Sequence, residues 1–192
     1  MTNQSDKPTA HVIKFSVLKT PLPTDPPGAN DFYHQLGILM VAWGRLEGHF
    51  TLTLLNLMRL AGAQEVSHKL PAQWESRKKL WERALKVIPS LAYLELDASK
   101  LLDEIIDTAQ DRNLLVHGMW GEFQKDIPVK IEVASIKYQK STPDGLLFGR
   151  HDITVDILKT ITGRINDHNK LLHPISVVIA SIESTPQDAQ II

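Results

Sequence analysis

An arginine, an asparagine and a histidine lie close together at the end of one predicted helix. They belong to the segment Arg112-Asn113-Leu114-Leu115-Val116-His117. The guanidinium of arginine stays protonated at biological pH, whereas the imidazole of histidine titrates near neutrality. Together they can bind a phosphate and transfer a proton without a metal ion. The segment therefore indicates acid–base chemistry on a phosphate ester.

A helical wheel of the segment over about 97–117 places these polar side chains on its inward face. At about 100° per residue, Arg112 and Asn113 fall inside the apolar arc and His117 falls at its edge. Leu114 projects among the acidic positions instead. Polar groups that face a core are costly unless they are paired or used, so this turn is a candidate functional site. The apolar members of the arc are Leu101, Leu102, Ile105, Ile106, Ala109 and Val116.

Each candidate residue has a functional role and a structural one to weigh. Arg112 would bind a scissile phosphate, or it forms an ion pair with Glu47 or a neighbouring aspartate. His117 would act as general acid or base, or it hydrogen-bonds the last carbonyls of its helix. Asn113 precedes His117 by one turn, so it can orient the imidazole, bind substrate, or form a structural hydrogen bond. Glu47 either orients Arg112 or is an ordinary polar residue between helices.

The predicted second helix is the most basic segment of the chain. Its residues Arg77, Lys78 and Lys79 are candidates for contact with an RNA backbone, and a solvated face explains them as well. The histidines show no metal-ligand spacing with carboxylates, and the chain has neither a glycine-rich phosphate loop nor a serine nucleophile elbow. We therefore expect no metal and no cofactor.

The composition is that of an ordinary globular chain. Its 192 residues are 43% hydrophobic and 22% charged, with a formal net charge of -1. Overall charge gives no attraction for nucleic acid, so RNA binding would need a local basic patch. The absence of cysteine excludes disulfides and thiolate metal sites and fits a reducing cytoplasm. The sequence shows no signal core and no membrane-spanning run, so we expect a cytoplasmic protein without membrane contact.

Hydrophobic periodicity predicts one mainly α domain over residues 31–184. The expected architecture is an antiparallel four-helix bundle with a small antiparallel sheet inserted between the third and fourth helices. Asn30 or Asp31 is expected to cap the first helix, and Thr154 the fourth. The predicted helices cover about 30–60, 71–88, 97–117 and 155–184, and the predicted strands cover 118–123, 129–138 and 146–153.

The two ends of the chain are expected to lie outside this domain. Residues 1–30 contain a proline cluster and read as a flexible segment, with a candidate edge strand at 11–18. Residues 185–192 read as a frayed tail.

The segment from Arg112 to Gly118 resembles the Arg–polar–x–x–x–His signature of the HEPN superfamily (higher eukaryotes and prokaryotes nucleotide-binding). The match includes the asparagine that commonly follows the arginine. The first helix, with Trp43 and Glu47, is similar to that of one branch of the superfamily. The resemblance covers roughly Asp31 to Ala180.

This resemblance implies a metal-independent endoribonuclease, of the kind found in toxin–antitoxin, phage-defence and RNA-processing systems. It implies a homodimer in which Arg112 and His117 of both subunits line one composite site, and an antitoxin protein as a further partner. One toxin branch has a tyrosine two residues after the histidine. Here that position is Met119, so regulation through such a tyrosine is not expected.

Two other functions stay open from the sequence. Some members of the superfamily are inactive, so the alternative is a module that binds a nucleotide or a protein without turnover. The third reading is a plain helical domain in which Arg112 only pairs with Glu47. The nuclease reading expects the Arg112 guanidinium and the His117 imidazole to converge on one open crevice, whereas the plain-domain reading expects both groups to be closed off from solvent.

Overall fold

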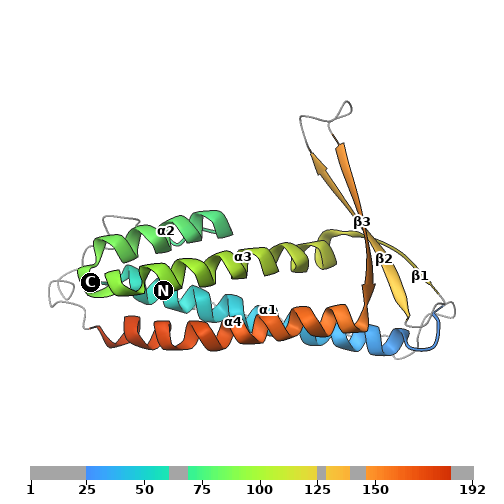
Figure 1. Ribbon diagram of the computed structural model, residues 1–192, viewed down its shortest axis with the longest axis horizontal. Helices are drawn as coiled ribbons and strands as arrows, with labels where there is room; N and C mark the ends of the chain where they lie inside the picture. The colour runs from blue at the N-terminus through green and yellow to red at the C-terminus, as the bar shows by residue number, and fades with distance from the viewer. Residues whose placement is uncertain (1–24, 61–68, 125–128, 139–145, 183–192) are drawn as a thin grey trace, which may run out of the picture.

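The computed structural model describes residues 25–60, 69–124, 129–138 and 146–182. These ranges contain four α-helices and a three-stranded antiparallel sheet between the third and fourth helices (Figure 1). The predicted mainly α fold with an inserted sheet is thus confirmed. The helices are α1 (Ala29–Met58), α2 (Trp74–Val87), α3 (Glu95–His117) and α4 (Val155–Ser181), and a short 3-10 helix, η2 (Pro89–Leu94), joins α2 to α3.

Some expectations fall on parts of the chain outside this description. The candidate edge strand at 11–18 and the tail at 185–192 both lie there. Of the predicted flexible segment, only its last residues are described, and α1 already begins within them at Ala29.

The start of α1 differs from the prediction. Gly28 occupies the N-cap position with a φ of 95°, a left-handed conformation that glycine adopts without a steric penalty. The backbone N–H of Ala29 donates to the carbonyl of Pro26 at 3.1 Å. No side chain caps the helix, so the expected cap by Asn30 or Asp31 is wrong. The preceding prolines and the glycine fix the start of the helix through the backbone.

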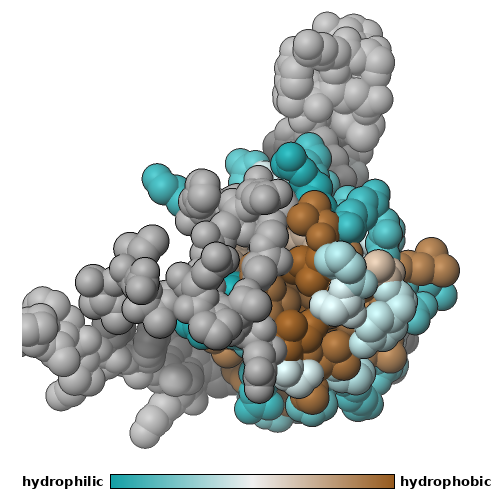
Figure 2. Space-filling view, turned by 90° about the vertical axis from the view of Figure 1, so that its left-hand side faces the viewer, coloured by the Kyte–Doolittle hydropathy of each residue, from teal (hydrophilic) through white to brown (hydrophobic). Residues whose placement is uncertain are grey.

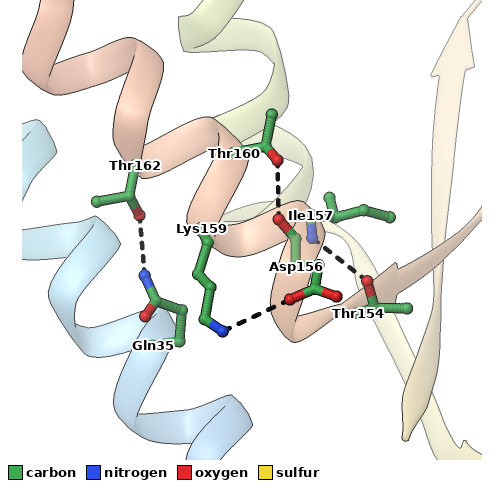
Figure 3. A network of polar contacts seen from close by, with 7 residues as sticks. All are labelled: Gln35, Thr154, Asp156, Ile157, Lys159, Thr160 and Thr162. Atoms are coloured by element: carbon green, nitrogen blue, oxygen red, sulfur yellow. Dashed lines mark hydrogen bonds and ion pairs between the residues drawn. The ribbon is translucent and has the colours of Figure 1, made fainter. Parts of the chain in front are cut away.

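The start of α4 follows the prediction (Figure 3). The hydroxyl oxygen of Thr154 accepts a hydrogen bond from the backbone N–H of Ile157 at 3.3 Å. Asp156 lies in the first turn, where a carboxylate is favourable, and it pairs with Lys159 at 3.5 Å. The helix continues through Pro174 to Ser181. The buried inner stripe of this helix consists of Leu158, Ile161, Ile165, Leu172 and Ile175.

α1 and α4 run in the same direction, so the expected all-antiparallel bundle is wrong for this pair. The Gln35 side chain donates to the Thr162 hydroxyl near the start of both helices (Figure 3). Farther along both, His49 and Asn169 form a hydrogen bond of 2.7 Å. Figure 1 shows both helices starting beside the sheet and ending at the opposite end of the molecule.

α2 also runs in the same direction as α1. Two tryptophans of α2 pack against aromatic residues in the middle of α1. Trp74 stacks on Phe50 at 5.1 Å and lies 5.6 Å from Trp43, and Trp81 lies 5.3 Å from Phe50. The chain therefore re-enters the helical body beside the middle of α1 instead of continuing from its end. α3 then returns toward the sheet, antiparallel to α2 and α4 (Figure 1).

The sheet closes the end of the helical body where α3 finishes. Its strands β1 (Met119–Gln124), β2 (Lys130–Tyr138) and β3 (Leu146–Thr154) pair in that order, and β1 carries an irregularity between Trp120 and Phe123. Both aromatic rings meet the Phe32 ring of α1 edge to face, at 5.8 and 5.4 Å. Figure 1 shows the outer part of the β2–β3 hairpin standing away from the helices. The aromatic cluster thus holds the residues after α3 against the start of α1.

The opposite end of the molecule exposes apolar residues. Figure 2 shows a brown area ringed by hydrophilic residues, partly behind atoms drawn in grey. Tyr93 of η2 and Leu96 at the start of α3 are among the exposed large apolar side chains. Among the described residues, no helix is long and apolar enough to cross a membrane.

Candidate functional site

The candidate site lies on α3, at the point beyond which α2 no longer packs beside this helix. The inward face of α3 is buried from Ala98 through Ile105 to Ala109. Val116 continues the same arc two turns later, yet it is 39% exposed. Figure 1 shows that α2 runs beside the first part of α3 only. Arg112 stands between the last buried member of the arc and the exposed valine.

The sheet, not α2, covers the last turn of α3, and this changes which side chains face inward. Leu115 is buried and Leu114 is half-buried against the core. Asn113 is exposed, although the helical wheel placed it inward together with Val116. The indole N–H of Trp120 in β1 donates to the Leu115 carbonyl at 3.1 Å. The helical wheel was therefore wrong for Asn113 and Leu114, because the sheet covers a different side of the helix from α2.

Gly118 makes this close fit possible. Its backbone N–H donates to the Leu114 carbonyl at 2.8 Å and ends the helix. A Cβ at this position would overlap the Leu114 carbonyl oxygen and the Val133 side chain of β2. The φ of -68° suits any residue, so the need for glycine comes from packing alone. Packing therefore explains why a glycine follows the motif histidine, and the sequence alone did not reveal this.

Arg112 is half-buried and forms no ion pair within the described residues. The carbon at the centre of its guanidinium lies 5.7 Å from the centroid of the Trp43 ring, a cation–π distance. One terminal nitrogen donates to the Asn113 side-chain oxygen at 3.0 Å. Its Nε atom is buried without an acceptor among the described residues. The bond to Asn113 lies on the exposed side, so an anion can approach the guanidinium through its terminal nitrogens, whereas the buried Nε atom is out of reach.

Glu47 pairs with Arg77 and not with Arg112. The distance between the Glu47 carboxylate and the Arg77 guanidinium is 3.6 Å. Arg77 also donates its Nε hydrogen to the Pro71 carbonyl at 2.8 Å and lies 5.6 Å from the Trp74 ring centre. Its side chain is only 12% exposed, so it is a fixed part of the α1–α2 contact. The Arg77 guanidinium is therefore mostly buried and already paired, which disfavours the predicted contact with RNA.

The other two basic candidates on α2 differ from each other. Lys78 forms ion pairs with Asp103 of α3 and with Glu82. The hydrogen bond with Asp103 is the main cause that raises the pKa of Lys78. Lys79 is exposed. Of the predicted basic patch, Lys79 is the member most open to a polyanion.

His117 is exposed at the end of α3, and no described contact joins it to Arg112 or Asn113. Five residues of α-helix turn the chain by about 500°, so the two side chains leave the helix about 140° apart. The structure therefore brings Arg112 and Asn113 together and leaves His117 on a different side.

A buried polar network between α3 and α4 was missed by the sequence analysis. His168 lies 3.0 Å from the Thr108 hydroxyl, and Arg164 donates to the same hydroxyl at 2.8 Å. The His168 Nδ1 atom has no hydrogen-bond partner in the described part of the chain, although the Glu104 carboxylate is 3.8 Å away. Burial is the main cause that lowers the pKa of His168. Its spacing between Ile165 and Leu172 on the inner stripe was the signal that could have revealed it.

Metal binding and family membership were both open to test. Within the described ranges, no three histidine or acidic side chains gather closely enough to hold a metal ion. No protein-family model matches the chain, and neither the curated proteins nor the solved structures contain a match. The placement of Arg112, Asn113 and His117 is therefore the basis on which a function can be proposed.

Proposed function

We propose that this protein is a metal-independent endoribonuclease of HEPN type, which cleaves RNA at a composite site in a homodimer. The observation that carries the proposal is the guanidinium of Arg112. It is half-buried against Trp43 at the end of the inward face of α3, and no carboxylate among the described residues neutralises it. A scissile phosphate would bind the terminal nitrogens, on the side where the guanidinium contacts the exposed Asn113.

In the proposed reaction, the 2′-hydroxyl of a ribose attacks the adjacent phosphorus. The new O2′–P bond forms as the P–O5′ bond breaks, which leaves a cyclic phosphate and a free 5′-hydroxyl. His117 removes the proton of the attacking hydroxyl or delivers one to the leaving oxygen. Arg112 stabilises the charge that gathers on the phosphate in the transition state, and Asn113 orients the guanidinium.

A second copy of the chain is needed because Arg112 and His117 leave one helix in different directions. Two copies related by a twofold axis can supply the arginine from one chain and the histidine from the other. Val116 and Met119, which are exposed apolar residues beside the motif, support an interface at this place. An inhibitory partner such as an antitoxin would act by covering the same surface.

The test is cleavage of RNA in the presence of a chelator. His117→Ala should lower the rate by about 10²- to 10⁴-fold, the usual contribution of a general acid or base. Arg112→Gln should lower it as well. The matched control is His173→Ala, since His173 is an exposed histidine on α4 outside the motif. Circular dichroism must show that all variants remain folded. If His117→Ala cleaves RNA like the parent protein, the proposal is wrong.

A binding module without turnover is the second candidate. It is favoured by the lack of any contact between Arg112 and His117 within one chain. In that case a short RNA would bind, Arg112→Gln would weaken its binding, and no product would form at any enzyme concentration. Product analysis and binding measured on the same samples separate the two functions.

A further inference from the structure

The two carboxylates that the sequence offered to Arg112 are both held by other arginines. Glu47 lies one turn after Trp43 on α1, beside the ring that Arg112 covers. Asp111 directly precedes Arg112 on α3. Each of these acids could neutralise Arg112, yet neither pairs with it in the described structure.

Arg77 holds Glu47 toward α2. Three further contacts fix this arginine. It donates to the Pro71 carbonyl at 2.8 Å and to the Thr51 hydroxyl at 3.4 Å, and it lies over the Trp74 ring. The Glu47 side chain is 38% exposed and has freedom to turn, whereas Arg77 is almost enclosed. The position of the carboxylate is therefore set by the arginine.

Arg164 pairs with Asp111 from α4, and its side chain is 44% exposed, unlike that of Arg77. One nitrogen of its guanidinium lies 2.9 Å from the Asp111 carboxylate, and the other donates to the Thr108 hydroxyl at 2.8 Å. Thr108 in turn contacts His168 of α4. Arg164 thus contacts two residues of α3, and the Asp111 carboxylate pairs with Arg164 instead of Arg112.

We propose that Arg77 and Arg164 are positioning residues that keep Glu47 and Asp111 away from Arg112, so that its guanidinium stays available for a phosphate. An acid already paired with Arg112 would have to be displaced before an anion could bind, and this competition would weaken binding. The inference rests on the proposed function, because it concerns the same phosphate site. It adds two residues, on α2 and α4, that touch neither RNA nor the reacting atoms.

The experiment measures binding of a short 2′-O-methyl RNA, whose attacking hydroxyl is blocked, at fixed ionic strength. Arg77→Gln and Arg164→Gln should each weaken binding by about fivefold, the effect of one partly exposed ion pair. The double variants Arg77→Gln/Glu47→Gln and Arg164→Gln/Asp111→Asn should return to the parent affinity, because the freed acid is then absent.

Arg83→Gln is the matched control for the loss of one positive charge. Arg83 is an exposed arginine on α2, and no ion pair is described for it. Its variant should bind the RNA like the parent. The inference is overturned if the double variants bind as weakly as the single ones, or if the single variants bind like Arg83→Gln.

A second readout does not depend on RNA. Phenylglyoxal modifies arginine, and mass spectrometry of the digested protein gives its rate at Arg112. A carboxylate that pairs with Arg112 should slow this reaction in Arg77→Gln, and the Glu47→Gln change should restore it. If the modification follows this pattern but RNA does not bind even to the parent protein, the positioning role holds and the proposed function fails. An unchanged rate in both single variants would reject the positioning role.

Discussion

The two halves of α3 have the same hydrophobic pattern and different surroundings. In the first half, α2 and α4 enclose the inward arc, and Leu102 and Ile105 are almost completely buried. In the second half α2 is absent, and Val116 on the same arc is exposed (Figure 1). The amphipathic pattern of a helix thus predicts which of its faces is buried. The helices and strands packed beside it determine how much of that face is buried.

Polar residues on the inward arc of the two halves differ in how many hydrogen-bond partners they have. Thr108, in the enclosed part, is satisfied by the Glu104 carbonyl, by Arg164 and by His168. Arg112, one turn later, donates to Asn113, and its buried Nε atom finds no acceptor within the ranges that the structure describes. The polar residue in the enclosed half joins two helices, and the one at its limit has fewer partners among the described residues.

The largest expected effect comes from shortening side chains in each half. Leu102→Ala should lower the free energy of unfolding by about 2–5 kcal/mol, because it leaves a cavity in the enclosed core. Val116→Ala should cost less than about 1 kcal/mol, as for most exposed sites. Urea unfolding followed by circular dichroism measures both. Equal losses in dilute protein would contradict the comparison. A Val116→Ala loss that grows with protein concentration would show that a second copy covers the exposed half.

A medium effect is expected from adding one methyl group at the end of α3. Gly118→Ala should destabilise the protein by about 1–3 kcal/mol, because its Cβ would overlap the Leu114 carbonyl and Val133. The control is Gly163→Ala in α4, where nothing lies within 4 Å of the added carbon. That variant should gain about 0.5–1 kcal/mol from helix propensity. Thermal unfolding compares the two. A harmless Gly118→Ala would mean that the sheet does not fix the last turn.

The smallest effect concerns the pH dependence of the α3–α4 contact. Burial lowers the pKa of His168 in the folded protein, and the groups that face it are Glu104, Arg164 and Asp167. The unfolded chain therefore binds this proton more readily than the folded one. His168 thus stabilises the fold fully above the unfolded pKa of about 6.5, and this contribution declines as the pH falls below that value.

The measurement is the melting temperature between about pH 5 and pH 8, the range around the ordinary histidine pKa. His168→Gln should flatten the fall in stability toward low pH, since the burial of a titrating group is removed. His173→Gln, which changes an exposed histidine of the same helix, should leave the profile as it is. Identical profiles for the two variants would show that His168 is not the group responsible.

Local sequence signals predicted much of the fold. The four helices and three strands occur close to their expected ranges, and Thr154 caps α4 as expected. These features depend on residues that are neighbours in the chain, such as apolar side chains three or four positions apart. The same signals failed at the start of α1, where the backbone conformation of Gly28 replaces a side-chain cap.

By itself, the sequence determined which segments are helical and that Arg112 belongs to the inward arc of α3, because both follow from local periodicity. Only the tertiary structure decided that α2 runs with α1, that Glu47 belongs to Arg77, and that Arg112 lies against Trp43 without an acid. These outcomes depend on contacts between residues far apart in the chain. Local periodicity carries no information about such contacts, so the pairing of Glu47 with Arg77 could not be read from it.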